Sequence, residues 1–190
     1  APTQVIIIPI AMHKEGVLEK NRELYTELKK KFRVEIDERD NVTPGYKFND
    51  CEMRGIPVRI EMGPRDIENG NVVVVRRNKK EKEVVALTNL ETRLEELLED
   101  IQTSMFNACL KRREEKTTVA YSLEEILKNL EENQGYVKTM WCEDRSCEDK
   151  VKEVAGAPSR CIPFNQEHLA DTCAICGKPA KKMVVWGRQY

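Results

Sequence analysis

The sequence predicts an α/β fold: a mixed five-stranded sheet flanked by helices, followed by a small α+β domain that contains most of the cysteines. Two observations predict this arrangement. Strand-like, β-branched runs alternate with helix-like segments along the first part of the chain, and two close cysteine pairs lie in the last part. Alternating strands and helices are typical of crossover units in a partly parallel sheet. We therefore expect a first domain over residues 1–116, ending in a linker helix, and a second domain over residues 117–190.

The strands of the first domain are predicted from their residue types and spacing. The run at 4–10 is almost continuously apolar and β-branched, as in a strand buried on both faces, whereas 56–62 alternates apolar and charged residues as a half-exposed strand does. Asn69-Gly70-Asn71 is a hairpin-type turn signal before the next run. The five expected strands are residues 4–10, 34–36, 56–62, 72–75 and 83–87.

The helices are predicted from apolar residues at helical spacing and from start and stop signals. Residues 17–32 repeat apolar side chains at that spacing, and a short helix is expected at 46–54 after the turn Thr43-Pro44-Gly45. A long charged helix at 90–116 would link the two domains. Ser122-Leu123-Glu124-Glu125 is a capping-box pattern that starts a further helix, which ends near Gly135. Beyond it we expect strands at 136–141 and 183–186 and a short helix at 147–154.

Composition excludes several classes of protein. The 190 residues are 40% apolar, enough for a real core, and the longest apolar stretch, residues 5–12, falls far short of the roughly 20 residues that span a bilayer. No secretory leader is recognisable, so we expect a soluble cytoplasmic protein without a membrane partner. The net charge of -1 argues against non-specific binding of nucleic acid. Any such binding must use local basic patches, for which the candidates are Arg76, Arg77, Lys79, Lys80 and the run Lys111–Arg113.

The start of the chain suggests that the sequence is a fragment. It begins with Ala1 and not with Met, and strand-like residues begin by Val5. We expect that it was excised from a longer protein; removal of an initiator Met is the simpler alternative.

Four cysteines have the spacing of a metal site. Cys142 and Cys147 have four residues between them, Cys173 and Cys176 have two, and 25 residues separate the pairs. Two such chelating loops can close a tetrahedron around zinc, with Zn–S distances of about 2.3 Å and no open position for catalysis. The sequence therefore predicts a structural zinc ion; the alternative is four reduced thiols without a metal. Of the other cysteines, Cys161 is expected to be a buried apolar residue, and Cys51 and Cys109 helix or core positions.

Several segments together resemble prolyl-tRNA synthetases of the archaeal and eukaryotic type, a form also found in some bacteria. The resemblance covers essentially the whole chain, and most of its motifs are weak singly but specific in their order. They are Ala1-Pro2-Thr3-Gln4-Val5, Thr43-Pro44-Gly45-Tyr46-Lys47-Phe48, Gly63-Pro64-Arg65-Asp66, Val75-Arg76-Arg77, Cys161-Ile162-Pro163-Phe164, the two cysteine pairs and Tyr190.

The resemblance implies an anticodon-binding domain followed by a zinc-binding domain, from the C-terminal part of a proline-tRNA ligase. The full enzyme, expected to be a homodimer, activates proline with ATP and Mg²⁺ and charges tRNA(Pro). The catalytic motifs lie upstream in the family and have no counterpart here, so this chain alone is not expected to be catalytic. In the family the terminal carboxylate folds toward the catalytic centre; here we expect a disordered or repositioned end at Tyr190.

The resemblance also implies which residues read the anticodon. Proline anticodons end in two guanines, whose exposed Watson–Crick edges offer N1–H and N2–H donors and an O6 acceptor. A carboxylate can accept both donors, and a Lys or Arg can donate to O6. The positions that match the family's guanine contacts are Glu52, Arg59, Asp66 and Lys82. The turn 78–81 lacks the family's usual glycine, so Lys80 could take the place of Lys82.

Two other interpretations stay open. The chain could be a stand-alone, non-catalytic tRNA-binding or scaffolding module derived from a synthetase. It could also be the matching domain of a threonyl, histidyl or glycyl enzyme, but those lack the cysteine-bearing extension.

Overall fold

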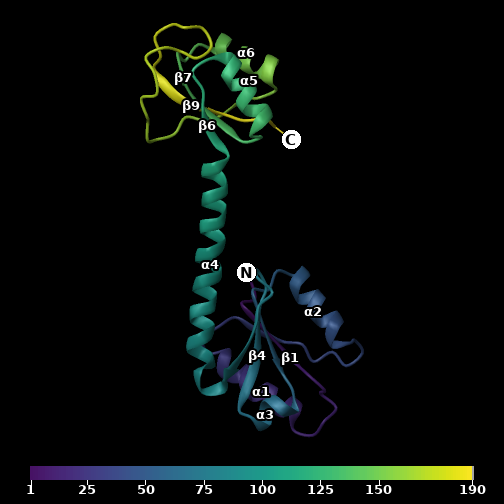
Figure 1. The fold of residues 1–190 in the computed structure, drawn as a ribbon. Coiled ribbons are helices and arrows are strands. Elements are labelled where there is room, and N and C mark those ends of the chain that lie inside the picture. The colour runs from purple at the N-terminus through teal and green to yellow at the C-terminus, as the bar shows by residue number, and fades with distance from the viewer. Residues whose placement is uncertain (190) are drawn as a thin grey trace. The chain divides into compact units, whose positions relative to one another are not determined.

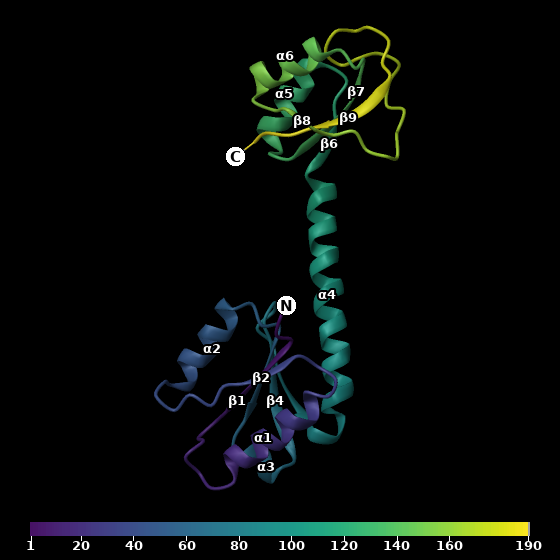
Figure 2. The same cartoon turned by 180° about the vertical axis from the view of Figure 1, so that it is seen from behind.

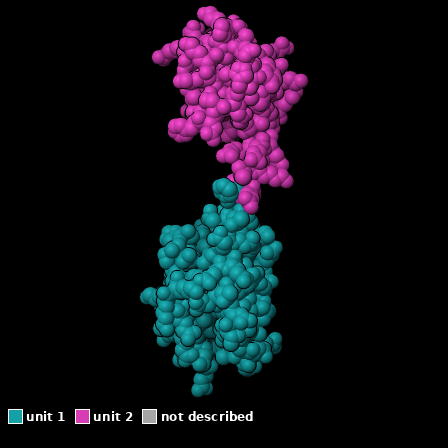
Figure 3. Space-filling view, turned by 90° about the vertical axis from the view of Figure 1, so that its left-hand side faces the viewer, with its two compact units in different colours: residues 1–106 teal, residues 107–190 magenta. Residues whose placement is uncertain are grey.

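The computed structural model describes residues 1–189, which form two units divided after Phe106 (Figure 3). Each unit has its own sheet and its own core. The division falls within one long helix, α4 (Leu90–Glu115), which belongs to the first unit up to Phe106.

The first unit contains the predicted mixed five-stranded sheet. Its strands lie in the order β2-β1-β3-β4-β5; β1 is parallel to both β2 and β3, while β4 is antiparallel to β3 and β5 (Figure 1). All five strands lie within two residues of the predicted bounds at both ends. They are β1 (Val5–Pro9), β2 (Val34–Ile36), β3 (Val58–Met62), β4 (Asn71–Arg76) and β5 (Lys82–Ala86).

Helices cover the two faces of this sheet unequally. On one face α1 (Val17–Leu28) and the first part of α4 bury Leu24, Leu28 and Leu94 against β-branched side chains of the sheet. On the other face only α2 (Pro44–Met53) packs, with Cys51 against Ile6 and Ile8 (Figures 1 and 2). Helix α2 is short and lies over β1, so the part of the same face formed by β4 and β5 is open. Val84 of β5, for example, is 68% exposed.

Local sequence explains where α2 begins. The Thr43 side chain accepts a hydrogen bond from the Tyr46 N–H over 3.3 Å, and Pro44 follows as the first helical residue, where its missing N–H costs nothing. The helix therefore starts two residues earlier than predicted. Conversely, α1 stops at Leu28, four residues before its predicted end, although Phe32 is still buried. The short helix α3 (Pro64–Glu68) follows β3, and a 3₁₀ turn (Leu87–Asn89) precedes α4.

The second unit is a four-stranded sheet with two helices on one face. The strand order is β6-β7-β9-β8, with only β6 and β7 parallel. Strands β6 and β8 were not predicted, because three residues with partly exposed side chains carry no readable alternation. The elements are β6 (Thr117–Val119), α5 (Leu123–Glu132), β7 (Tyr136–Trp141), α6 (Arg145–Ala155), β8 (Ser159–Cys161) and β9 (Lys182–Trp186).

The core of the second unit is small and is centred on a tryptophan. Trp186 is fully buried, and its indole N–H donates to the Thr139 hydroxyl over 2.8 Å, so the polar atom of the ring is satisfied. Around it α5 contributes Ile126 and Leu130, and α6 contributes Val151. A core of this size is marginal for an independent unit, which makes a metal staple physically reasonable.

Gly135 permits a close approach between the end of α4 and the start of β7. The Tyr136 N–H donates to the Lys116 carbonyl over 2.8 Å, and a Cβ at position 135 would lie 1.9 Å from that same oxygen. Glycine is therefore required here for lack of space.

Among residues 1–189, no helix combines the length and the apolar character needed to cross a membrane. Tyr190, for which a disordered or repositioned end was expected, lies outside the described residues.

Candidate functional sites

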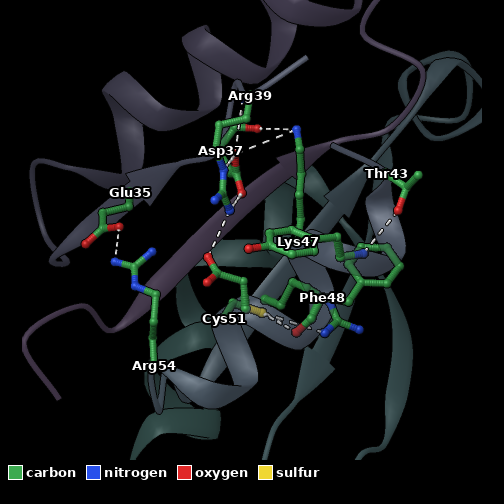
Figure 4. Close-up of polar contacts among 11 residues, drawn as sticks. Glu35, Asp37, Arg39, Thr43, Lys47, Phe48, Cys51 and Arg54 are labelled. Atoms are coloured by element: carbon green, nitrogen blue, oxygen red, sulfur yellow. Dashed lines mark hydrogen bonds and ion pairs between the residues drawn. The ribbon is translucent and has the colours of Figure 1, made fainter. Parts of the chain in front are cut away.

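Helix α2 is attached to the sheet by a buried lysine. Lys47 is only 2% exposed; its ammonium donates to the Asp37 backbone carbonyl over 2.9 Å and lies 3.7 Å from the Asp37 carboxylate (Figure 4). Arg39 in turn binds the Asp37 carboxylate and reaches Asp50 of α2 over 2.8 Å. These contacts connect the loop after β2 to α2. They set the position of the side chains that α2 presents to the sheet, Phe48 and Glu52 among them.

Strand register places two rows of side chains on the face that α2 only partly covers. Ile6, Arg59, Val75 and Lys82 are paired in succession across β1, β3, β4 and β5. The next row on the same face is Ile8, Glu61, Val73 and Val84. Side chains two residues apart on one strand share a face. The open half of this face therefore carries one arginine, one glutamate and one lysine among valines.

The predicted residues Glu52 and Arg59 meet at the edge of α2. The Arg59 side chain is 7% exposed, and its guanidinium carbon lies 4.1 Å from the centre of the Phe48 ring. One guanidinium nitrogen, Nη1, is 3.5 Å from the Glu52 carboxylate. The other nitrogens face Glu61, at 3.0 Å from Nε and 2.9 Å from Nη2. An arginine stacked on an aromatic ring and paired on two edges is held in one orientation.

Both lysines considered for the fourth position reach this cluster. The Lys82 ammonium is 3.4 Å from both Glu61 oxygens and 5.8 Å from the Phe48 ring centre. The Lys80 ammonium is 3.9 Å from the second oxygen of Glu52. Lys80 has a φ of 57°, the left-handed conformation that glycine adopts freely, at the turn that lacks the family's glycine. We refer to six residues as the Arg59 cluster: Phe48, Glu52, Arg59, Glu61, Lys80 and Lys82.

Asp66 is not part of this cluster. It lies in the first turn of α3, beyond the carboxyl end of β3, and its carboxylate accepts the Gly63 N–H over 2.8 Å. Within residues 1–189 no hydrogen bond or ion pair joins Asp66 to Glu52, Arg59 or Lys82. Three strand residues, about 10 Å of strand, separate Arg59 from the end of β3. The structure therefore brings Glu52, Arg59 and Lys82 together and leaves Asp66 apart from them.

Arg76 does not suit the phosphate-binding role considered for it. It is 5% exposed, and its guanidinium is occupied by Asp100 and Ser104 of α4 and by Asn78. The residue joins β4 to α4 inside the first unit. Arg77 is different: its side chain is exposed and donates to the Glu52 carbonyl over 2.8 Å, which places a cation beside the cluster.

Sequence reasoning missed Glu61, although the signal was present. Arg59-Ile60-Glu61 alternates charged, apolar and charged residues on a predicted strand, so the two charged side chains had to share a face. Phe48 belongs to the segment 43–48 that carries part of the resemblance, but no contact was predicted for its ring. Its place under the guanidinium could not be read from sequence, because the way α2 packs on the neighbouring β3 is set by tertiary contacts.

The four predicted cysteines come together in the second unit. Their sulfur atoms all lie within 4.8 Å of one another, and Cys142 Sγ is 3.7 Å from the sulfurs of both Cys147 and Cys176. A tetrahedron with metal–sulfur bonds of about 2.3 Å has edges of about 3.8 Å. The sulfur spacing therefore fits a metal ion bound to four sulfur atoms at about 2.3 Å.

Backbone geometry aims the two cysteine loops at one point. Cys142 follows β7, and Cys147 lies in the first turn of α6, whose N-cap Asp144 accepts the Ser146 N–H over 3.0 Å. In the second loop the Gly177 N–H donates to the Cys173 carbonyl over 2.9 Å, with Gly177 at a φ of 71°.

The thiols differ in acidity. Burial raises the pKa of Cys142 and Cys147, whereas the backbone N–H of Lys178 lowers the pKa of Cys176 to about 7. A bound cation favours the thiolate form of its ligands. The donor set therefore suits a thiophilic divalent metal.

The prediction for Cys161 was wrong. It was expected to be buried, but it is exposed on the edge strand β8, because a three-residue edge strand has no layer above it. Cys51 is buried under Arg59, and Cys109 lies exposed on α4. His168 is an exposed residue whose ring lies 3.0 Å from Asp171.

Both units match known families. Residues 4–97 match the family described as "Anticodon binding domain", and residues 123–190 match "Prolyl-tRNA synthetase, C-terminal". The first unit, with its mixed sheet, is therefore an anticodon-binding domain. The part of the chain from residue 123 is a prolyl-tRNA synthetase C-terminal domain, which excludes the threonyl, histidyl and glycyl alternatives.

Individual relatives agree with this assignment. The chain is 52% identical over 190 residues to a proline–tRNA ligase from Clostridium botulinum strain ATCC 19397 and 54% identical to proline–tRNA ligase 2 from Bacillus cereus strain ATCC 14579. A proline–tRNA ligase 2 from Bacillus thuringiensis is also 54% identical. Each alignment covers 100% of this chain and 40% of the relative. The chain thus spans about 40% of the length of these relatives. All three are bacterial, so they do not support the archaeal and eukaryotic qualifier.

Proposed function

We propose that this chain binds tRNA(Pro) by reading the guanines of its anticodon on the open face of the first unit. The observation that supports this is the meeting of Glu52, Arg59 and Lys82 on one partly open sheet face. Sequence-specific RNA recognition targets unstacked bases through their edges and through stacking. The match of residues 4–97 to anticodon-binding domains points to the same partner.

The cluster has the donors and acceptors that a guanine edge requires. Glu52 is one-third exposed, and its contacts with Arg59 and Lys80, at 3.5 and 3.9 Å, are long. Its carboxylate can therefore accept N1–H and N2–H of a base at little cost. Lys82 or Lys80 donates to O6. Arg59 is nearly buried against Phe48, so it contributes its Nη1 edge beside Glu52 and no open face for stacking.

Asp66 enters the proposal as a contact to the second guanine. Its carboxylate is half-buried at the start of α3, and about 10 Å of strand separates Arg59 from the end of β3, after which α3 begins. One base cannot bridge that span together with Arg59, so the two guanines must be splayed along β3. The exposed Val84 and partly buried Val73 provide an apolar floor beside them.

The full protein would be a proline–tRNA ligase, which activates proline with ATP and Mg²⁺ in a catalytic part outside this chain and acts as a cytoplasmic homodimer. The names of the relatives, of which the chain spans 40%, support the ligase activity. The four cysteines would hold one structural Zn²⁺, because four thiolates leave no coordination position for a reactant.

The test is binding of the 190-residue chain to RNA stem-loops. We expect a stem-loop with a proline anticodon to bind more tightly than versions with either guanine replaced by adenine, by about 1 to 3 kcal/mol per base. Glu52→Ala should reduce discrimination at one guanine and Asp66→Ala at the other. Lys79→Ala is the control, because it should only lower the salt dependence. Equal binding of all stem-loops would disprove the proposal.

A further inference from the structure

Glu61 is the most firmly held acidic residue of the Arg59 cluster. Its side chain is 12% exposed, and one oxygen accepts a hydrogen bond from Arg59 Nε over 3.0 Å and lies 2.9 Å from Nη2 as an ion pair. The Lys82 ammonium lies 3.4 Å from both of its oxygens. A single carboxylate therefore joins a cation of β3 to a cation of β5, across the intervening β4.

Glu52 differs from Glu61 in both exposure and distance. The Glu52 side chain is 34% exposed, and its carboxylate is 3.5 Å from Arg59 and 3.9 Å from Lys80. Contacts of that length lie outside the range of good charge-assisted hydrogen bonds, about 2.7–2.9 Å, whereas those of Glu61 to Arg59 lie close to it. One acid is therefore fully engaged inside the protein and the other is available to a ligand.

We propose that Glu61 is a positioning residue for anticodon reading, and this inference depends on the function proposed above. By accepting a hydrogen bond from Nε and pairing with Nη2, Glu61 fixes the Arg59 guanidinium over the Phe48 ring with its Nη1 edge toward Glu52. Glu61 itself does not touch the base.

The physical reason is competition for Arg59. The guanidinium is a nearly buried charge, and such a charge needs a hydrogen-bonded counter-ion. If Glu61 carried no charge, Glu52 would be the nearest remaining carboxylate and would close onto Arg59 as its partner. Glu52 could then no longer accept both guanine N–H groups. Loss of the Glu61 charge should therefore weaken base discrimination through Glu52.

Glu61→Gln tests this directly, because the amide keeps the size of the side chain and removes its charge. The matched control is Glu83→Gln on β5, where both carboxylate oxygens accept from Arg93 Nε, at 3.0 and 3.2 Å, but outside the cluster. Both variants and the unchanged chain are assayed with the proline-anticodon stem-loop and its guanine-to-adenine versions. We expect Glu61→Gln to lower the discrimination ratio about tenfold. The salt dependence should stay unchanged, and Glu83→Gln should leave the ratio as it is.

A double-variant cycle separates positioning from simple structural loss. In the Glu52→Ala background, Glu61→Gln should lower discrimination no further, because its effect passes through Glu52. If Glu61→Gln unfolds the domain in a thermal melt, Glu61→Asp decides in the same assay: it keeps the charge but shortens the reach, and it should give an intermediate ratio.

The outcomes distinguish this inference from the proposed function. If Glu52→Ala lowers the ratio and Glu61→Gln or Glu61→Asp does not, Glu61 has no positioning role and the proposed function stands. If the unchanged chain shows no discrimination at all, the proposed function fails and the inference fails with it.

Discussion

The ammonium group of Lys47 donates to the backbone carbonyl of Asp37 over 2.9 Å in an almost fully buried position. Lys47 belongs to α2, and Asp37 comes directly after β2, at the edge of the sheet. This contact, and the ion pair of 3.7 Å between the Lys47 ammonium and the Asp37 carboxylate, attach α2 to the edge of the sheet. The position of Phe48 and Glu52 follows from it.

Replacing Lys47 with Met should destabilise the first unit by about 2 to 3 kcal/mol, because the Asp37 carbonyl loses its buried donor while Arg39 still neutralises the carboxylate. The measurement is urea unfolding of the chain followed by circular dichroism. Lys20→Met is the control, since Lys20 forms only an exposed pair with Glu23 and should change stability by less than about 1 kcal/mol. Equal effects of the two substitutions would contradict the anchoring role of Lys47.

Acid should weaken this attachment through Asp37. Burial by itself would raise the pKa of Asp37, but hydrogen bonds from Arg39 and the nearby Lys47 charge outweigh it and lower the pKa. A lowered folded-state pKa adds stability that is present above the ordinary aspartate value of about 4 and is lost as the pH falls through the folded value.

Asp37→Asn should therefore be less stable than the unchanged chain at pH 7, by roughly 2 kcal/mol, and the difference should shrink below about pH 4. Urea midpoints at pH 7, 5 and 3 measure this. Asp40→Asn, at an exposed position three residues further on, serves as the comparison. A difference that stays constant down to pH 3 would show that the Asp37 charge does not contribute.

Metal removal should affect the second unit alone. We expect one zinc ion per chain by elemental analysis, and its chelation should unfold the second unit while the first keeps its circular dichroism signal. Trp141 and Trp186 form an edge-on pair 6.4 Å apart in the second unit, so near-ultraviolet circular dichroism reports on that unit.

Cys142→Ser should abolish metal binding, because it removes one of four ligands. Cys161→Ser is the matched control: Cys161 is an exposed cysteine of the same unit outside the cluster and should leave the metal content unchanged. A chain that contains no metal after purification in zinc would disprove the site.

Patterns that are local in sequence were predictable. The β-branched run before Pro9 and the cysteine spacings each specify a structure within a few residues, and the five-stranded sheet was confirmed. Element bounds were less accurate at the ends of α1 and α2. Strands β6 and β8 were missed because three residues do not make a pattern.

The sequence by itself determined the order of elements, the two-part organisation of strand-rich and cysteine-bearing segments, and the four cysteines that meet. Only the tertiary structure decided which charges face each other. It engaged Arg59 with Glu61 more tightly than with Glu52, set Asp66 apart beyond the end of β3, and buried Arg76 against α4. The reason is physical: periodicity fixes which face of an element a side chain occupies, but partners on different strands and helices are set by sheet register and helix packing, which depend on the whole core.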